Sequence, residues 1–310
     1  MRMRVLFLDK VHPILKKGLK SLSFICHEDY ESEKNDICKK IDKYHGIIIR
    51  SRFKLDKNFL KSASNLKFIA RAGSGLENID LDFCKDKQIK CINAPEGNAQ
   101  AVSEHAIGML LSLFNNLNNA NLEVKKGLWR REENRGVELK GKIFGIIGYG
   151  NTGSRIASIL SGFGVKILAY DKYKKDFQHE SSLSDIFENA DIVSLHVPLT
   201  KETENLINKH FISQMKRPFY IINTSRGKCI NIRDLIQSFE SNKILGACLD
   251  VLPFENISFE SISQESNELR YLMSSRKTIL SPHIAGWTHE SRRKIADLLL
   301  KKITRFHDQL

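Results

Sequence analysis

Short apolar runs alternate with Lys-rich polar stretches through the first hundred residues. Runs of this length are typical of buried strands, and the stretches between them have helical spacing or turn residues. The predicted strands are Val5–Leu8, Phe24–Cys26, Gly46–Ile49, Lys67–Ala70 and Lys90–Asn93. This alternation predicts an open α/β sheet.

A long amphipathic pattern follows and predicts one helix from Asn98 to about Glu123 that bridges two domains. A second alternating series then begins, and it predicts a doubly wound parallel sheet. Its strands are expected at Ile143–Ile147, Val165–Tyr170, Ile192–His196, Tyr220–Asn223, Gly246–Asp250 and Thr278–Ser281. The polar stretch Phe254–Arg276 is interpreted as loop and short helix. Glu290–His307 is predicted to be a helix that returns to the first domain.

Length and composition narrow the class of protein. A chain of 310 residues with 41% apolar residues predicts two globular domains. No apolar stretch reaches the length of a membrane span, and the first ten residues are predicted to be a strand, not a signal peptide. Six scattered cysteines without a ligand cluster favour reduced thiols, no metal site and a cytoplasmic location.

The net charge of +13 raises the question of a polyanionic partner. The lysines are spread along the whole chain, whereas a nucleic-acid-binding protein more often gathers them into a stripe with aromatic residues. We therefore expect no nucleic-acid partner. The positive surface suits a small anionic substrate.

A glycine fingerprint stands between a predicted strand and a predicted helix. Gly148, Gly150 and Gly153 form G-x-G-x-x-G, and Asp171 ends the next strand 21 residues after Gly150. In this pattern the glycines admit a pyrophosphate to the helix N-terminus, and the acid binds the ribose hydroxyls. The pattern predicts NAD, because the carboxylate repels a 2′-phosphate. Three lysines close behind the acid are expected to soften that repulsion: Lys172, Lys174 and Lys175. The alternative is a glycine-rich turn without a ligand.

Three later strand ends carry groups that suit the oxidation of a 2-hydroxy acid. Arg226 can grip a carboxylate with two parallel hydrogen bonds, and His283 can take the hydroxyl proton. Glu255 can orient the imidazole and favour its charged form. Taken singly, each residue also fits a surface turn, a solvated acid or a structural histidine. His196 is interpreted as part of a wall around the adenine.

These motifs resemble the D-isomer-specific 2-hydroxyacid dehydrogenases, most closely their phosphoglycerate dehydrogenase branch, nearly end to end. Besides the fingerprint and the three strand ends, the resemblance rests on 71–80 (RAGSGLENID), 93–98 (NAPEGN) and 103–106 (SEHA). It implies a catalytic domain of residues 1–97 plus 285–310, with an NAD-binding Rossmann domain of residues 98–284 inserted between them. It also implies a homodimer joined through the cofactor domains.

The same resemblance assigns further site residues. Arg226, Glu255 and His283 correspond to the catalytic triad. The implied cofactor contacts, besides the glycines and Asp171, are Asn151, Thr152, His196, Val197, Pro198, Thr224, Ser225, Asp250 and Gly286. The implied substrate contacts are Arg50, Ser51, Arg71, Gly73, Ser74, Gly75 and Asn98, with Gly73-Ser74-Gly75 as a backbone cradle for the substrate carboxylate.

The segment Arg50-Ser51-Arg52 resembles the one that holds the substrate phosphate in phosphoglycerate dehydrogenases. Arg50 and Arg52 follow a buried strand and are expected to point to opposite faces. The expected reaction is oxidation of 3-phospho-D-glycerate to 3-phosphohydroxypyruvate, the entry to serine synthesis. A solvated basic strand end is the alternative for the segment. A glyoxylate or hydroxypyruvate reductase and an NAD-sensing corepressor are the alternatives for the protein.

The sequence departs from the family pattern at three places. Asn256 follows Glu255 where relatives usually have a proline, which puts the shape of that loop in doubt. Trp287 stands where many relatives have a small residue, and we expect it to narrow the pocket mouth. The sequence ends at Leu310, so no C-terminal regulatory domain and no inhibition by serine are expected.

Overall fold

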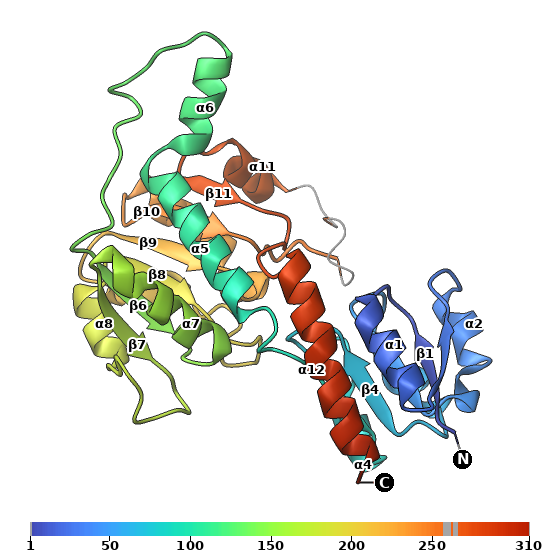
Figure 1. The fold of residues 1–310 in the computed structure, drawn as a ribbon. Helices are drawn as coiled ribbons and strands as arrows, with labels where there is room; N and C mark the ends of the chain where they lie inside the picture. Colours follow the sequence, from blue (N-terminus) through green and yellow to red (C-terminus); the bar gives the residue numbers. More distant parts are fainter. Residues whose placement is uncertain (1, 257–261, 263–265, 310) are drawn as a thin grey trace. The chain divides into compact units, whose positions relative to one another are not determined.

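The computed structural model describes residues 2–256, 262 and 266–309. The chain divides into two compact units. One combines Met1–Asn98 with Trp287–Leu310, and the other combines Ala99–Glu255 with a segment that ends at Gly286. Each unit is built on a parallel sheet, so the prediction of two parallel-sheet α/β domains is confirmed (Figure 1).

The sheet of the first unit has five strands in the order β2-β1-β3-β4-β5. Their bounds are β1 (Arg4–Phe7), β2 (Ile25–Glu28), β3 (Gly46–Ile49), β4 (Phe68–Arg71) and β5 (Lys90–Ile92). Each lies at a predicted strand, to within one or two residues. The helices of this unit are α1 (Pro13–Ser21), α2 (Lys34–Cys38), α3 (Lys57–Lys61), α4 (Leu81–Asp86) and α12 (His289–His307), with a 3₁₀ turn at Ile41–Lys43.

Helix α12 closes one apolar face of this sheet. Ile295, Leu299 and Ile303 are buried on it and belong to the same apolar cluster as Phe7 and Phe68 of the strands. A capping box at Thr288 begins the helix, which lies beside α1 in Figure 1. The last helix of the chain therefore completes the core of its first unit.

The sheet of the second unit has six parallel strands in the order β11-β10-β9-β8-β6-β7. Their bounds are β6 (Ile143–Ile147), β7 (Lys166–Tyr170), β8 (Ile192–Leu195), β9 (Phe219–Asn223), β10 (Ile244–Leu249) and β11 (Thr278–Leu280). All six predicted strands are present. The strand order reverses between β6 and β8, and ligands of open α/β sheets bind beyond the carboxyl ends of the strands at such a point.

Helices cover both faces of the second sheet. They are α5 (Ala99–Phe114), α6 (Leu117–Lys125), α7 (Asn151–Leu160), α8 (Leu183–Asn189), α9 (Lys209–Gln214), α10 (Ile232–Glu240) and α11 (Asn267–Ser274), with 3₁₀ turns at Ser161–Phe163 and Gly227–Cys229. The interpretation of Phe254–Arg276 as loop and short helix is confirmed for α11. Residues 257–261 and 263–265 of that stretch lie outside the described residues.

The prediction of one helix from Asn98 to about Glu123 is wrong. The chain forms two helices, because Asn116 adopts a left-handed conformation with φ of 51° between them. Asparagine tolerates this conformation better than most residues, and its side chain donates a hydrogen bond to Arg135 O over 3.3 Å. Helix α6 therefore takes a direction of its own and projects from the second sheet (Figure 1).

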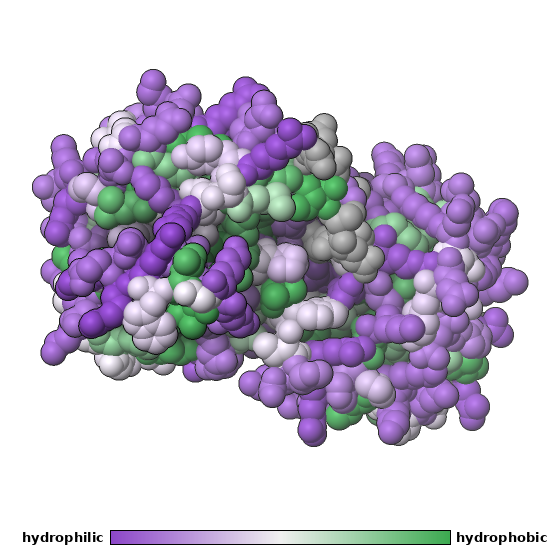
Figure 2. Space-filling view, turned by 90° about the horizontal axis from the view of Figure 1, so that it is seen from above, coloured by the Kyte–Doolittle hydropathy of each residue, from purple (hydrophilic) through white to green (hydrophobic). Residues whose placement is uncertain are grey.

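Hydrophilic side chains dominate the face drawn in Figure 2, and apolar side chains appear between them. Among the described residues, no helix is long and apolar enough to cross a membrane.

Candidate active site

The turn from β6 to α7 has the properties that a pyrophosphate site requires. Gly148 has φ of +94°, and a Cβ at this position would lie 2.4 Å from His196 O. A Cβ at Gly153 would lie 1.9 Å from Gly148 O, so both positions exclude a side chain. Gly150, the N-cap of α7, would place a Cβ in open space. Helix α7 begins with Asn151 and Thr152, and the backbone N–H groups of this first turn are thus accessible to a phosphate.

Asp171 stands directly after β7, next to this turn. Its carboxylate accepts hydrogen bonds from the backbone N–H groups of Tyr149, Tyr173 and Lys174 at 2.7, 2.9 and 3.0 Å. Burial tends to raise the pKa of Asp171, but these three donors and the Lys174 charge outweigh burial and lower it. The carboxyl is therefore ionised at neutral pH and is suited to bind ribose hydroxyls.

The loop after β8 lies opposite the glycine turn. His196 Nε2 lies 2.9 Å from Ser194 Oγ, and burial lowers the pKa of His196 to about 4. A neutral, partly buried imidazole suits a wall better than a proton acceptor. Val197 follows and lies close to Gly148, and Pro198 O accepts a hydrogen bond from Thr203.

His283 and Glu255 form a direct pair beyond β10 and β11. His283 Nδ1 lies 2.6 Å from Glu255 Oε2, and Glu255 Oε1 also accepts from Leu252 N. The carboxylate orients the imidazole ring through Nδ1. His283 has φ of 56°, an uncommon conformation for a residue with a side chain, and its N–H donates to Asp250 O over 2.8 Å.

Asp250 anchors the loop that carries this histidine. Its carboxylate is 1% exposed and accepts hydrogen bonds from Ser281 Oγ at 2.6 Å and from Ile284 N and Ala285 N, both at 2.8 Å. Gly286 ends the loop. The sequence predicted a cofactor contact for Asp250 and missed the anchoring, because backbone N–H donors leave no trace in a residue pattern.

His105 was another residue that sequence reasoning left without a role. Its Nε2 lies 2.8 Å from Ser281 Oγ, so α5 is tied to the same anchor. The available signal was its place in the segment Ser103-Glu104-His105-Ala106, which carried part of the family resemblance.

Arg226 follows β9 and lies against the same loop cluster. Asn223 Nδ2 donates to Arg226 O over 2.9 Å, and Arg226 Nη1 donates to Ser225 O over 2.6 Å. A Cβ at Gly227 would lie 2.1 Å from the carbonyl carbon of Leu252, so this loop lies directly on the loop that leads to Glu255. The carboxyl edge of β9, β10 and β11 thus brings the three predicted catalytic loops together.

Two hydroxyls after β9 behave differently. Ser225 Oγ is buried and donates to Asn223 Oδ1 over 2.8 Å, so the protein itself uses it. Among the described side chains, Thr224 Oγ1 is buried and has no hydrogen-bond partner. Since buried polar groups are normally satisfied, this hydroxyl fits a polar group of a bound ligand. The glycine turn, Asp171 and Thr224 together fit a dinucleotide.

The predicted substrate residues of the first unit form their own cluster. Arg71 Nε donates to Arg50 O over 3.1 Å, and Arg71 Nη1 would lie 1.8 Å from a Cβ at Gly73. Ser74 Oγ donates to Asn98 Oδ1 over 2.7 Å, next to Gly75. The cradle and the two arginines therefore belong to one end of this sheet.

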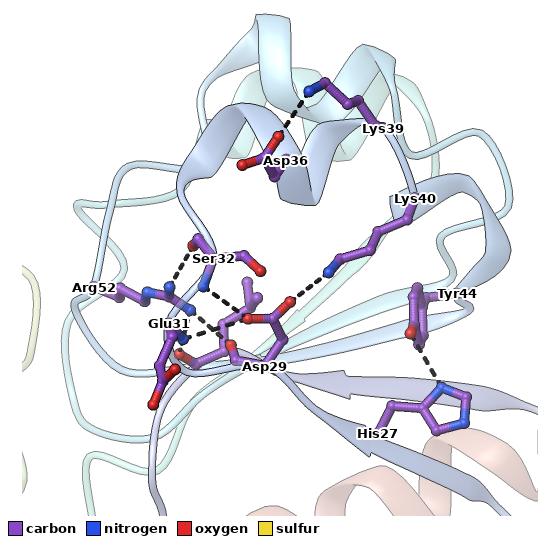
Figure 3. A network of polar contacts seen from close by, with 10 residues as sticks. His27, Asp29, Glu31, Ser32, Asp36, Lys39, Lys40, Tyr44 and Arg52 are labelled. Carbon is purple, nitrogen blue, oxygen red and sulfur yellow. Dashed lines mark hydrogen bonds and ion pairs between the residues drawn. The ribbon is translucent and has the colours of Figure 1, made fainter.

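Arg50 and Arg52 have different partners. Strand alternation does not account for this, because residues two apart on a strand share a face and both arginines lie after the end of β3. The Arg52 guanidinium donates to three backbone carbonyls, those of Leu8, Asp29 and Ser32, and so stabilises its own unit. Figure 3 shows its contacts with Asp29 and Ser32. The Arg50 guanidinium carbon lies 4.3 Å from the centre of the Trp287 ring, which is stacking distance.

One carboxylate shapes the backbone of this segment. Asp9, just after β1, accepts from the N–H groups of Arg50, Ser51 and Arg52 at 2.6, 3.2 and 3.3 Å. Ser51 is itself buried. Sequence reasoning missed Asp9, since it lies about forty residues away along the chain.

Comparison with known proteins agrees with this geometry. The model of the family "D-isomer specific 2-hydroxyacid dehydrogenase, NAD binding domain" matches residues 107–285. A hydroxypyruvate reductase of Thermotoga maritima is 36% identical over 274 residues, which are 87% of either chain. A D-3-phosphoglycerate dehydrogenase of Synechocystis is 33% identical over 94% of this chain, which spans 52% of that protein's length. The structure of a D-lactate dehydrogenase from Aquifex aeolicus, complexed with NAD and lactic acid, is 31% identical with a TM-score of 0.83 and covers 99% of this chain and 96% of its own.

Proposed function

Because the chain belongs to the NAD-dependent D-isomer-specific 2-hydroxyacid dehydrogenases, we propose that it oxidises 3-phospho-D-glycerate to 3-phosphohydroxypyruvate, the first step of serine synthesis. One observation carries the choice of substrate. Arg50, stacked on Trp287, lies next to Arg71 at the sheet end that holds the Gly73-Ser74-Gly75 cradle. Two cations suit a dianionic phosphate, and the Synechocystis relative named for this substrate supports the proposal.

The chemistry follows from the groups beyond β9, β10 and β11. In this proposal Arg226 binds the substrate carboxylate and polarises the oxygen on C2. His283 Nε2 takes the hydroxyl proton, and the Glu255 carboxylate 2.6 Å from Nδ1 stabilises the imidazolium that forms. NAD, when bound, supplies the acceptor for the hydride that leaves C2. It would be held by the glycine turn, Asp171 and the other predicted cofactor contacts.

The organisation of the enzyme follows the same proposal. Residues 1–97 plus 285–310 would form the catalytic domain, and residues 98–284 the NAD-binding domain. We also propose that it works in the cytoplasm on a small anionic 2-hydroxy acid.

A homodimer joined through the cofactor domains completes the proposal. It is supported by the apolar side chains exposed on and after α6, which are Leu117, Leu122, Val124 and, at 78% exposure, Trp129. Light scattering of the wild type should give the mass of a dimer. Paired Leu122→Glu and Trp129→Ser changes should give the mass of a monomer.

A second candidate, reduction of hydroxypyruvate or glyoxylate, is favoured by the Thermotoga relative, which is matched over 87% of both chains. Parallel assays separate the two. NADH formation would be followed with 3-phosphoglycerate, D-glycerate and D-lactate, and NADH consumption with hydroxypyruvate and glyoxylate.

The first candidate predicts the largest kcat/KM for 3-phosphoglycerate, and its loss in Arg50→Ala should exceed the loss for D-glycerate at least tenfold. Lys54→Ala, an exposed neighbouring cation, is the matched control. Equal losses for both acids would contradict a phosphate site at Arg50. A higher kcat/KM for hydroxypyruvate than for any phosphorylated acid would select the second candidate.

A further inference from the structure

An acid in the loop after β8 pairs with the first lysine after Asp171. Lys172 Nζ lies 2.8 Å from Glu202 Oε1, and Tyr173 Oη donates to Glu202 Oε2 over 2.6 Å. Lys172 Nζ also lies 5.5 Å from the centre of the Tyr173 ring. The side-chain hydrogen bonds lower the pKa of Glu202, and the bond to Glu202 raises the pKa of Lys172. Both groups are therefore charged at neutral pH.

The other two lysines of this loop are also engaged. Lys174 Nζ donates to Tyr149 O over 3.4 Å and lies 5.4 Å from the centre of the Tyr149 ring. Lys175 Nζ lies 3.7 Å from Glu180 Oε1. The sequence led us to expect that these lysines weaken the repulsion between Asp171 and a 2′-phosphate. Each lysine instead has a competing partner within the protein.

The position of the Glu202 contact matters for the cofactor. Glu202 belongs to the loop after β8, whereas Lys172 and Tyr173 follow β7. Strand β6 lies between these two strands, and its carboxyl end is the glycine turn. The contact therefore joins the loops after β7 and β8, which lie on either side of the proposed dinucleotide site at the end of β6.

We propose that Glu202 determines the selectivity for NAD over NADP, by holding Lys172 away from the ribose 2′ position. The inference rests on the placement of the adenosine ribose at Asp171 proposed above. NADP-binding sites of this fold supply a cation for the 2′-phosphate. Here the cation next in sequence to the acid is bound by another carboxylate, so Lys172 does not offset the repulsion between Asp171 and a 2′-phosphate.

Two fragments of the cofactor test the proposal without turnover, 5′-AMP and adenosine 2′,5′-bisphosphate. Their affinities for the full chain would be measured by calorimetry at low salt, because exposed charges are screened at high salt. Glu202→Gln should raise the affinity for the bisphosphate about fivefold and change that for 5′-AMP by less than twofold. Glu204→Gln, an exposed acid of the same loop, should leave both unchanged.

A double variant identifies the group that acts. Lys172→Ala combined with Glu202→Gln should restore the wild-type ratio of the two affinities, since the released cation is then gone. A ratio that stays raised in the double variant, or that never changes in Glu202→Gln, overturns the proposal. A wild type that binds neither fragment contradicts the cofactor site itself, which is a separate result.

Discussion

The carboxyl ends of the two sheets carry their functional groups in different ways. In the second unit, Glu255 and His283 bind each other, and backbone hydrogen bonds fix the loops around them. In the first unit, two arginines of one segment have different contacts. Arg52 donates to three backbone carbonyls, and Arg50 stacks on Trp287. The carboxylate–imidazole pair suits proton transfer, whereas a guanidinium stacked on an aromatic ring suits the binding of an anion.

The largest effect is expected at the paired groups of the second unit. His283→Ala should lower kcat by about 10² to 10⁴, because a positioned acid–base group contributes that much. The exposed His289→Ala is the control, and steady-state kinetics across pH is the measurement. An unchanged kcat at every pH would remove His283 from the reaction.

A smaller effect, on stability, is expected from His196. Its folded pKa of about 4 lies below the usual 6.5, so the unfolded chain binds a proton first as the pH falls. The free energy of unfolding should thus fall between pH 6.5 and 4, by about 3 kcal/mol at most. His196→Gln should lose less stability over this range in urea titrations, and His210→Gln should behave as the wild type. Identical losses in all three proteins would contradict the assignment.

The two arginines of the first unit are expected to contribute differently to stability. Arg52→Ala should lower the free energy of unfolding by about 2 kcal/mol, because three carbonyls lose a charged donor. Arg50→Ala should change stability by less than half as much. Urea unfolding of both variants checks this. Equal losses in the free energy of unfolding would contradict the different structural roles of the two arginines.

The smallest effect concerns the aromatic ring under Arg50. Trp287→Ala should raise KM for the phosphorylated acid about threefold with kcat unchanged, since an exposed cation–π contact contributes about 0.5–1 kcal/mol. Trp287→Phe should retain most of the affinity. Loss of kcat, or an equal rise of KM for D-glycerate, would show that the ring acts on something other than Arg50.

Features that depend on neighbours in sequence could be predicted from the sequence. The strands, the glycine turn and the acid after β7 all follow from local patterns, and the parallel sheets and the NAD-dependent family are confirmed. The break at Asn116 could not be predicted, because asparagine is tolerated both within a helix and in the left-handed conformation that ends one.

Residues whose role depends on distant partners escaped the prediction. Asp9 and Asp250 bind backbone N–H groups of segments far along the chain, and such donors are present in every residue except proline. The sequence likewise identified the three lysines after Asp171 but not the acids that engage two of them. The roles of the predicted site residues stay predictions until the variants above are measured.

Helix α12 has a consequence for how the protein is made. The apolar face formed by Phe7 and Phe68 is translated early, yet Ile295, Leu299 and Ile303, which bury it, are synthesised only after the whole second unit. The N-terminal sheet must therefore wait, partly uncovered, while the entire second unit is synthesised and has time to fold. Nascent chains that stall before residue 295 would display that face to chaperones, although the whole second unit has already been synthesised.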